Sequence, residues 1–170
     1  MLMTMNDSKP APDINSMIGK ILLKTFYGHT MGEVLALSVA LERVVDEFCA
    51  INLGGSSWEQ DAFAEYVLGH VPRDQKLKLL KHILIHVAHE DPHAVTSAVA
   101  AAYRLRDSLA HSALVEEGLD EQGWRLESRR RGVERSVKVS LDEVTNTVES
   151  GKDALAELIS LCGAPTNPTQ

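Results

Sequence analysis

The sequence predicts an all-α protein, an up-and-down helical bundle with a C-terminal β-hairpin and a closing helix. Apolar residues recur at helical spacing over most of the chain, and helix-capping patterns precede several of these segments. Strand-like alternation is confined to one segment after residue 118. The 170 residues, 44% hydrophobic and 24% charged, suffice for one domain with a core. We expect this domain over 14–162, a disordered tail at 1–13 and a frayed tail at 163–170.

The N-terminal half of the domain is expected to form two successive helices. A short apolar helix over 14–27 is predicted to end at Gly28, because glycine favours helix ends. The capping-box pattern Thr30-Met-Gly-Glu33 then predicts the start of a long helix. Its apolar positions, three or four residues apart, form a seam for packing lengthwise against other helices: Val34, Leu37, Leu41, Val44, Phe48 and Ile51.

Glycine, proline and capping residues delimit the middle helices. Glycine ends a helix readily, and proline is tolerated in a first turn because its missing N–H would be unpaired there. These signals stand at Gly54-Gly55, Pro72 and Asp91-Pro92. The expected segments are a short helix capped by Ser57 to Gln60 that ends near Gly69, a helix over 72–90 and a helix over 92–113.

The C-terminal part is predicted to contain a β-hairpin and a last helix. Polar and apolar residues alternate over 124–128 and 133–139, around Arg131-Gly132. Two strands alone are marginal in water, so we expect the hairpin to lie against the helices or to pair with another chain. A further capping box, Ser140-Leu-Asp-Glu143, opens a last helix that runs to about Leu161.

Charge and hydropathy exclude several classes of protein. The formal net charge of −7 argues against a protein whose whole surface binds nucleic acid, although 125–138 holds six basic and two acidic residues, a local balance of +4. No apolar run reaches the roughly 18 residues that cross a bilayer, and residues 1–13 lack the basic start and apolar stretch of a secretory signal. We therefore expect a cytoplasmic protein without membrane contact. The widely separated Cys49 and Cys162 are expected to be reduced packing residues.

The helix predicted over 92–113 places a charged residue on its apolar face. At about 100° per residue, Arg106 lies about 20° from Val95, where a charge is costly unless it is paired. One interpretation is a purely structural ion pair with a carboxylate of the long helix. The candidate partners are Glu42, Asp46 and Glu47.

The second interpretation rests on the run Arg106-Asp107-Ser108-Leu109-Ala110-His111. It resembles the motif of the HEPN superfamily (higher eukaryotes and prokaryotes nucleotide-binding domains), an arginine, a polar residue and a histidine after four to six intervening positions. Arg104 also satisfies the spacing, but only Arg106 is followed by the polar residue. The predicted order of helices, hairpin and closing helix over 30–161 resembles the same superfamily.

This resemblance implies a homodimer with a metal-independent endoribonuclease site at its interface and no cofactor. It further implies RNA as substrate, an antitoxin or regulatory protein as partner, and a role in defence or toxin–antitoxin biology. His111 would be the acid or base, Arg106 would hold the phosphate, Asp107 or Ser108 would orient the pair, and Arg104 would be a second phosphate contact. Arg106 and His111 lie about 140° apart on a regular helix, so a shared site requires a frayed helix end or both subunits.

Other interpretations remain open. The same helical dimer is expected of a noncatalytic interaction module, such as a regulator or an antitoxin-like subunit. A third class, a metal-dependent hydrolase, would use imidazoles one and two turns apart as transition-metal ligands; the weak candidates are His82, His86 and His89. Arg129-Arg130-Arg131 at the hairpin tip are candidate RNA-backbone contacts, or a solvated turn.

Overall fold

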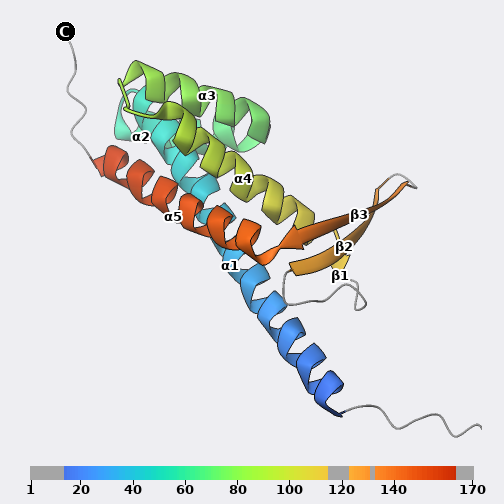
Figure 1. The fold of residues 1–170 in the computed structure, drawn as a ribbon. Helices are drawn as coiled ribbons and strands as arrows, with labels where there is room; N and C mark the ends of the chain where they lie inside the picture. Colours follow the sequence, from blue (N-terminus) through green and yellow to red (C-terminus); the bar gives the residue numbers. More distant parts are fainter. Residues whose placement is uncertain (1–13, 115–122, 131–132, 164–170) are drawn as a thin grey trace, which may run out of the picture.

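The structure, a computed structural model, describes residues 14–114, 123–130 and 133–163. It is mostly helical, as the sequence predicts (Figure 1). The predicted tail at 1–13 lies outside the described residues, as does the predicted tail at 163–170 except for Gly163, which ends α5. The helices are α1 (Ile14–Leu53), α2 (Ser57–Ala62), η1 (Phe63–Val67), η2 (Leu68–His70), α3 (Arg73–His86), α4 (Pro92–Ala110) and α5 (Leu141–Gly163). The antiparallel strands are β1 (Ala113–Leu114), β2 (Gly123–Arg130) and β3 (Val133–Ser140).

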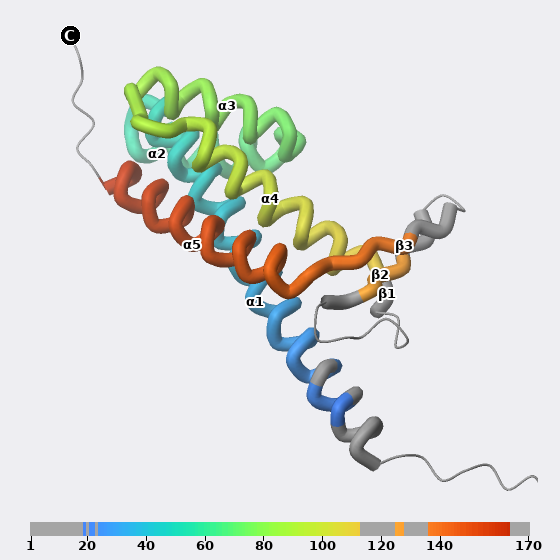
Figure 2. Tube along the Cα trace, in the orientation of Figure 1, coloured from blue at the N-terminus to red at the C-terminus, as the bar shows by residue number. Residues whose placement is uncertain are grey.

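The long helix α1 organises the molecule, because α3, α4 and α5 all pack on it. Figure 2 shows α3 near the start of α4 and the sheet near its end. The core fills the space between these helices with fully buried side chains that include Leu41, Phe48, Leu84, Val99 and Leu158. In the described part of the chain, no helix is both long and apolar enough to cross a membrane.

The predicted break at Gly28 is wrong, because α1 continues without interruption from Ile14 to Leu53. Thr30 does not cap a new helix. Its buried hydroxyl donates instead to the carbonyl of Phe26, one turn earlier, at 3.0 Å. A glycine within a helix costs about 1 kcal/mol, which the packing of the following turns offsets.

The predicted seam of α1 is confirmed for four of its six positions. Val34, Leu41 and Phe48 are buried together with Leu37, whereas Val44 and Ile51 are only half-buried. A straight α-helix drifts by about 20° for every seven residues relative to a 3.5-residue repeat. The series that starts at Leu37 therefore moves off the buried face, and Val45 takes the core position instead.

The start of α2 and the end of α3 differ from the prediction. The capping box before α2 uses Ser56, whose N–H and hydroxyl donate to the Glu59 carboxylate at 2.6 and 2.9 Å, and not Ser57. Helix α3 ends at His86, earlier than the predicted residue 90. The chain turns there because Ala88 adopts a left-handed conformation with φ of 56°, which ends a helix as glycine usually does.

The C-terminal elements follow the prediction. Strands β2 and β3 pair antiparallel from Gly123↔Ser140 to Arg130↔Val133, and β1 adds a short third strand that the sequence did not predict. The predicted end of the helix over 92–113 is wrong, because α4 stops at Ala110 and Ala113 pairs in β1. The Ser140 hydroxyl accepts the Glu143 N–H at 3.1 Å and caps α5. The hairpin lies against the helices, as expected, since Leu126 is fully buried.

Candidate functional site

Most candidate site residues lie on the last two turns of α4, and His111 directly follows its last residue, Ala110. This helix begins where the Asp91 carboxylate accepts the N–H groups of His93 and Ala94, at 3.1 and 2.9 Å, and Pro92 occupies the first turn. The backbone stays helical to its end, because the His111 N–H still donates to the Asp107 carbonyl at 3.1 Å. The frayed helix end that would bring His111 beside Arg106 within one chain is therefore absent from α4.

Arg106 is partly buried, as its angular position predicts, but the expected ion-pair partners are wrong. Its guanidinium donates to Asp107 Oδ1 at 2.9 Å, and 27% of the side chain remains exposed. The carboxylates of Glu42 and Asp46 are occupied by two basic residues of α3, and Glu47 is exposed. The side chain of Arg106 is thus held beside its neighbour and keeps an exposed edge.

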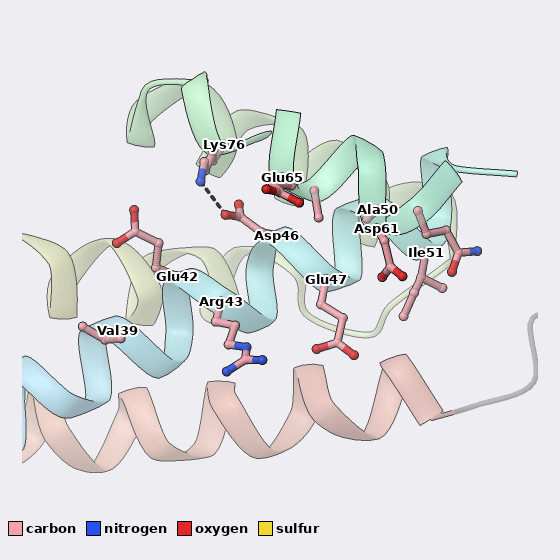
Figure 3. Close-up of a pocket in the computed structure, with 13 residues that line it drawn as sticks. Val39, Glu42, Arg43, Asp46, Glu47, Ala50, Ile51, Asp61, Glu65 and Lys76 are labelled. Carbon is pink, nitrogen blue, oxygen red and sulfur yellow. Dashed lines mark hydrogen bonds and ion pairs between the residues drawn. The ribbon is translucent and has the colours of Figure 1, made fainter. Parts of the chain in front are cut away.

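The two α3 residues that bind Glu42 and Asp46 are Arg73 and Lys76. Neither was predicted from the sequence as a site residue. Arg73 donates to Asp107 at 3.0 Å and to Glu42 at 3.2 Å, so it links α3 to both α4 and α1. Lys76 is almost fully buried and lies 2.7 Å from Asp46 Oδ2. Figure 3 marks this ion pair with a dashed line. Lys76 stands four residues before the buried Leu80, so helical spacing could have placed it on the buried face.

Burial is the largest cause of the pKa shifts of Asp46 and Tyr103, which lie in or beside this network. It raises the pKa of Asp46, although the hydrogen bond and charge of Lys76 work in the opposite direction. It also raises the pKa of the Tyr103 hydroxyl, and the charges of Glu42 and Asp46 raise it further. The guanidinium of Arg73 stacks 5.3 Å from the centre of the Tyr103 ring.

His111 and Arg104 project from the exposed part of α4. Both side chains are exposed, whereas Asp107 and Ser108 are half-buried. Within the described residues, the His111 imidazole has no hydrogen-bond partner and remains available to a ligand. The structure thus brings Arg106 and Asp107 together with Arg73, and leaves His111 apart from them.

The other predicted candidates are not assembled into a site. His82 and His86 are exposed on α3, but His89 lies beyond the end of that helix with a buried imidazole. Its Nε2 lies 2.6 Å from Glu157 of α5, and its Nδ1 accepts the Asp91 N–H at 3.1 Å. The three histidines therefore do not share one face. The part of the chain that the structure describes holds no cluster of three or more residues suited to a metal ion.

The basic hairpin tip lies partly outside the described residues. This applies to Arg131 and to the side chains of Arg129 and Arg130. Their proposed contact with RNA stays a prediction.

Two surface grooves are formed by described residues, and His111 lines neither of them. The larger, of about 930 Å³, lies between α1, α2, η1 and α3, and five carboxylates and two basic residues are among its lining side chains. The carboxylates are Glu42, Asp46, Glu47, Asp61 and Glu65, and the basic residues are Arg43 and Lys76 (Figure 3). The smaller, of about 260 Å³, lies between α3 and α4 and includes Arg104.

Comparison of the chain with protein-family models, with curated proteins and with solved structures finds no match. The resemblance to the HEPN superfamily therefore rests on the residues at the end of α4 and on the order of the helices.

Proposed function

We propose that the protein is a metal-independent endoribonuclease of the HEPN type whose site is shared between two copies of the chain. The observation that carries this proposal is the end of α4. There the His111 imidazole is exposed and has no partner among the described residues. Within two turns of it lies the Arg106 guanidinium, which Asp107 orients and which keeps an exposed edge. RNA cleavage without metal needs a base for the ribose 2′-hydroxyl and a cation for the phosphorane, and imidazole and guanidinium are suited to these two roles.

The chemistry assigns one role to each group. His111 takes the proton of a ribose 2′-hydroxyl, the resulting oxygen attacks the adjacent phosphorus, and the bond from phosphorus to the 5′-oxygen breaks. A protonated imidazole returns a proton to the departing 5′-oxygen. Arg106 stabilises the extra negative charge on the phosphorane, and Asp107 fixes the orientation of its guanidinium.

Two copies are required because α4 is regular up to His111. On such a helix Arg106 and His111 point about 140° apart, so one phosphodiester cannot contact both side chains of a single chain. The apolar side chains of Ile21, Leu22 and Phe26 support a second copy, since they are half-exposed or more on α1. Exposed apolar residues grouped on one segment are typical of a protein interface.

Cleavage of RNA in the presence of a chelator tests this proposal. The dimer should cut RNA but not DNA of the same sequence, because DNA lacks the 2′-hydroxyl. His111→Ala should lower the rate by about 100-fold or more, the contribution typical of a general acid or base. His86→Ala, which removes an exposed imidazole from α3, is the matched control and should leave the rate unchanged.

A noncatalytic interaction module is the alternative, and a specific observation favours it. Arg73, Lys76 and Arg106 are balanced by Glu42, Asp46 and Asp107, which is the arrangement expected of a structural network between helices. A folded dimer that leaves varied RNAs intact would decide for this alternative. A cytoplasmic setting, a role in defence or toxin–antitoxin biology and an antitoxin or regulatory partner stay predictions under either function.

A further inference from the structure

Basic side chains line the smaller groove, although the chain as a whole is acidic and most of the groove surface is apolar. It lies between α3 and α4 and is lined by Lys78, Lys81, His93 and Arg104, together with the hydroxyl residues Thr96 and Ser97. None of its described lining residues is an aspartate or a glutamate. In a chain of net charge −7, such a groove concentrates positive potential at one place.

Among the described residues, the basic side chains of this groove form no strong ion pairs with neighbouring carboxylates. Lys78 lies 4.0 Å from Asp74, and both side chains are about 70% exposed, so this pair is weak. Lys81 and Arg104 are exposed and, among the described residues, have no ion-pair partner. Arg73, on the same helix α3, contrasts with them because two carboxylates bind it.

The groove is aligned with the candidate catalytic histidine. His93, Ser97, Arg104 and His111 follow one another on one face of α4, within about 40° at 100° per residue. Arg104 and His111 are seven residues apart, or about 10 Å along the axis. That distance spans about three phosphates of a strand with its bases stacked.

We infer that this groove binds the backbone phosphates of a single-stranded nucleic acid and directs the strand along α4 toward His111. The binding part stands on the groove itself, and the delivery of RNA to His111 rests on the proposed function. Guanidinium and ammonium groups hold the phosphates. Because the contacts are to the backbone, the groove selects for a polyanion and not for a base sequence.

Binding of a fluorescent single-stranded DNA to the full chain, measured by anisotropy over a range of salt, tests the groove. DNA resists cleavage through the 2′-hydroxyl, so the measurement does not depend on the ribonuclease activity. Arg104→Ala should weaken binding about fivefold at low salt and reduce the slope of log K against log salt by about 0.7, the value for one phosphate contact. Lys81→Glu should weaken binding further.

The matched controls are Arg43→Ala and Arg43→Glu. Arg43 is an exposed arginine of α1 among the carboxylates of the larger groove, so these variants make the same changes of charge elsewhere. They should bind within about twofold of wild type, because a phosphate contact is local.

The inference would be overturned if the Arg43 variants lost as much affinity for DNA as Arg104→Ala and Lys81→Glu. A wild-type chain that binds no oligonucleotide would also overturn it. Binding to vesicles of phosphatidylserine in place of DNA would also overturn it and assign the groove to a lipid surface. If the wild-type chain leaves RNA intact but binds DNA in a way that depends on Arg104, only the proposed ribonuclease activity is overturned. The two proposals therefore fail separately.

Discussion

The buried ion pair of Lys76 and Asp46 is the most consequential contact at the residue scale. Lys76 is almost fully buried, and Asp46 Oδ2 is its ion-pair partner among the described residues. The other oxygen of Asp46 and the Tyr103 hydroxyl are buried without a hydrogen-bond partner in the described part of the chain. Such a network contributes little net stability, but removing one member leaves a charge without compensation.

Replacing Asp46 by asparagine should therefore destabilise the protein by about 3 kcal/mol, because the Lys76 ammonium would stay buried without a counter-charge. Urea unfolding at neutral pH measures the change. Glu47→Gln, the same substitution at the next, exposed residue, should cost less than about 0.5 kcal/mol. Equal effects at the two positions would contradict the importance of the pair.

The buried thiol of Cys49 predicts a loss of stability at alkaline pH. Burial, and after it the charge of Asp46, raises the pKa of Cys49 from 9.0 to about 12. Above about pH 9 the unfolded chain loses a proton that the folded chain retains, so stability falls as pH rises, by up to about 1.4 kcal/mol per pH unit. Burial also raises the pKa of Cys162, to about 11, which acts in the same direction.

Free energies of unfolding under reducing conditions, from about pH 8 to about pH 10.5, test this prediction. Cys49→Ala should decline less steeply than wild type over that range. Tyr27 and Tyr103, whose pKa values burial also raises, keep their contributions in both proteins. Parallel curves would show that the Cys49 thiol does not titrate differently in the folded and unfolded states.

At the scale of elements, local signals predicted the helices whose ends are fixed locally. Asp91-Pro92 and Ser140 start α4 and α5 as expected, because their side chains bind the first free N–H groups. Gly28 and Thr30 gave an equally clear local signal that was wrong. Local patterns do not show whether a threonine hydroxyl caps the next turn or bonds back to the previous one, and tertiary packing decides between them.

Gly28→Ala tests the continuity of α1. A Cβ at Gly28 would meet no atom within 4 Å, so alanine should stabilise a continuous helix by about 0.5–1 kcal/mol. If Gly28 instead ended a helix in a left-handed conformation, alanine would cost about 1 kcal/mol or more. Thermal or urea unfolding distinguishes the two signs.

Gly151→Ala is the comparison within α5. A Cβ there would lie 2.9 Å from Leu37 Cδ2, so the close approach of α5 to α1 depends on this glycine. The gain in helix propensity should be offset by repacking of Leu37, leaving this variant at least about 1 kcal/mol less stable than Gly28→Ala. Equal gains at both glycines would show that the contact between the two helices is loose.

At the scale of the whole molecule, the sequence predicted which residues of α4 are unusual but not their partners. The angular position of Arg106 indicated partial burial, and its half-buried side chain agrees. The predicted ion-pair partners of Arg106 were wrong because Glu42 and Asp46 instead bind Arg73 and Lys76 of α3. Periodicity within one helix does not show how helices cross. The basic groove was missed for the same reason, since it combines Lys81 with Arg104 across two helices.

The regular end of α4 predicts that a working site takes Arg106 from one copy and His111 from the other. Arg106→Ala and His111→Ala should each be inactive alone. After subunits exchange, about half of the dimers are mixed, and each mixed dimer holds one intact site of two. The mixture should therefore recover about a quarter of the wild-type rate of RNA cleavage.

The control for this recovery mixes Arg106→Ala with a chain that carries both substitutions. No pairing of these chains joins an arginine to a histidine, so the rate should stay at the level of the single variants. Sedimentation establishes that the chains in both mixtures are dimeric. An active wild type whose two single variants do not complement one another would place both residues of a site in one chain, and the regular turn of α4 would then have to open when RNA binds.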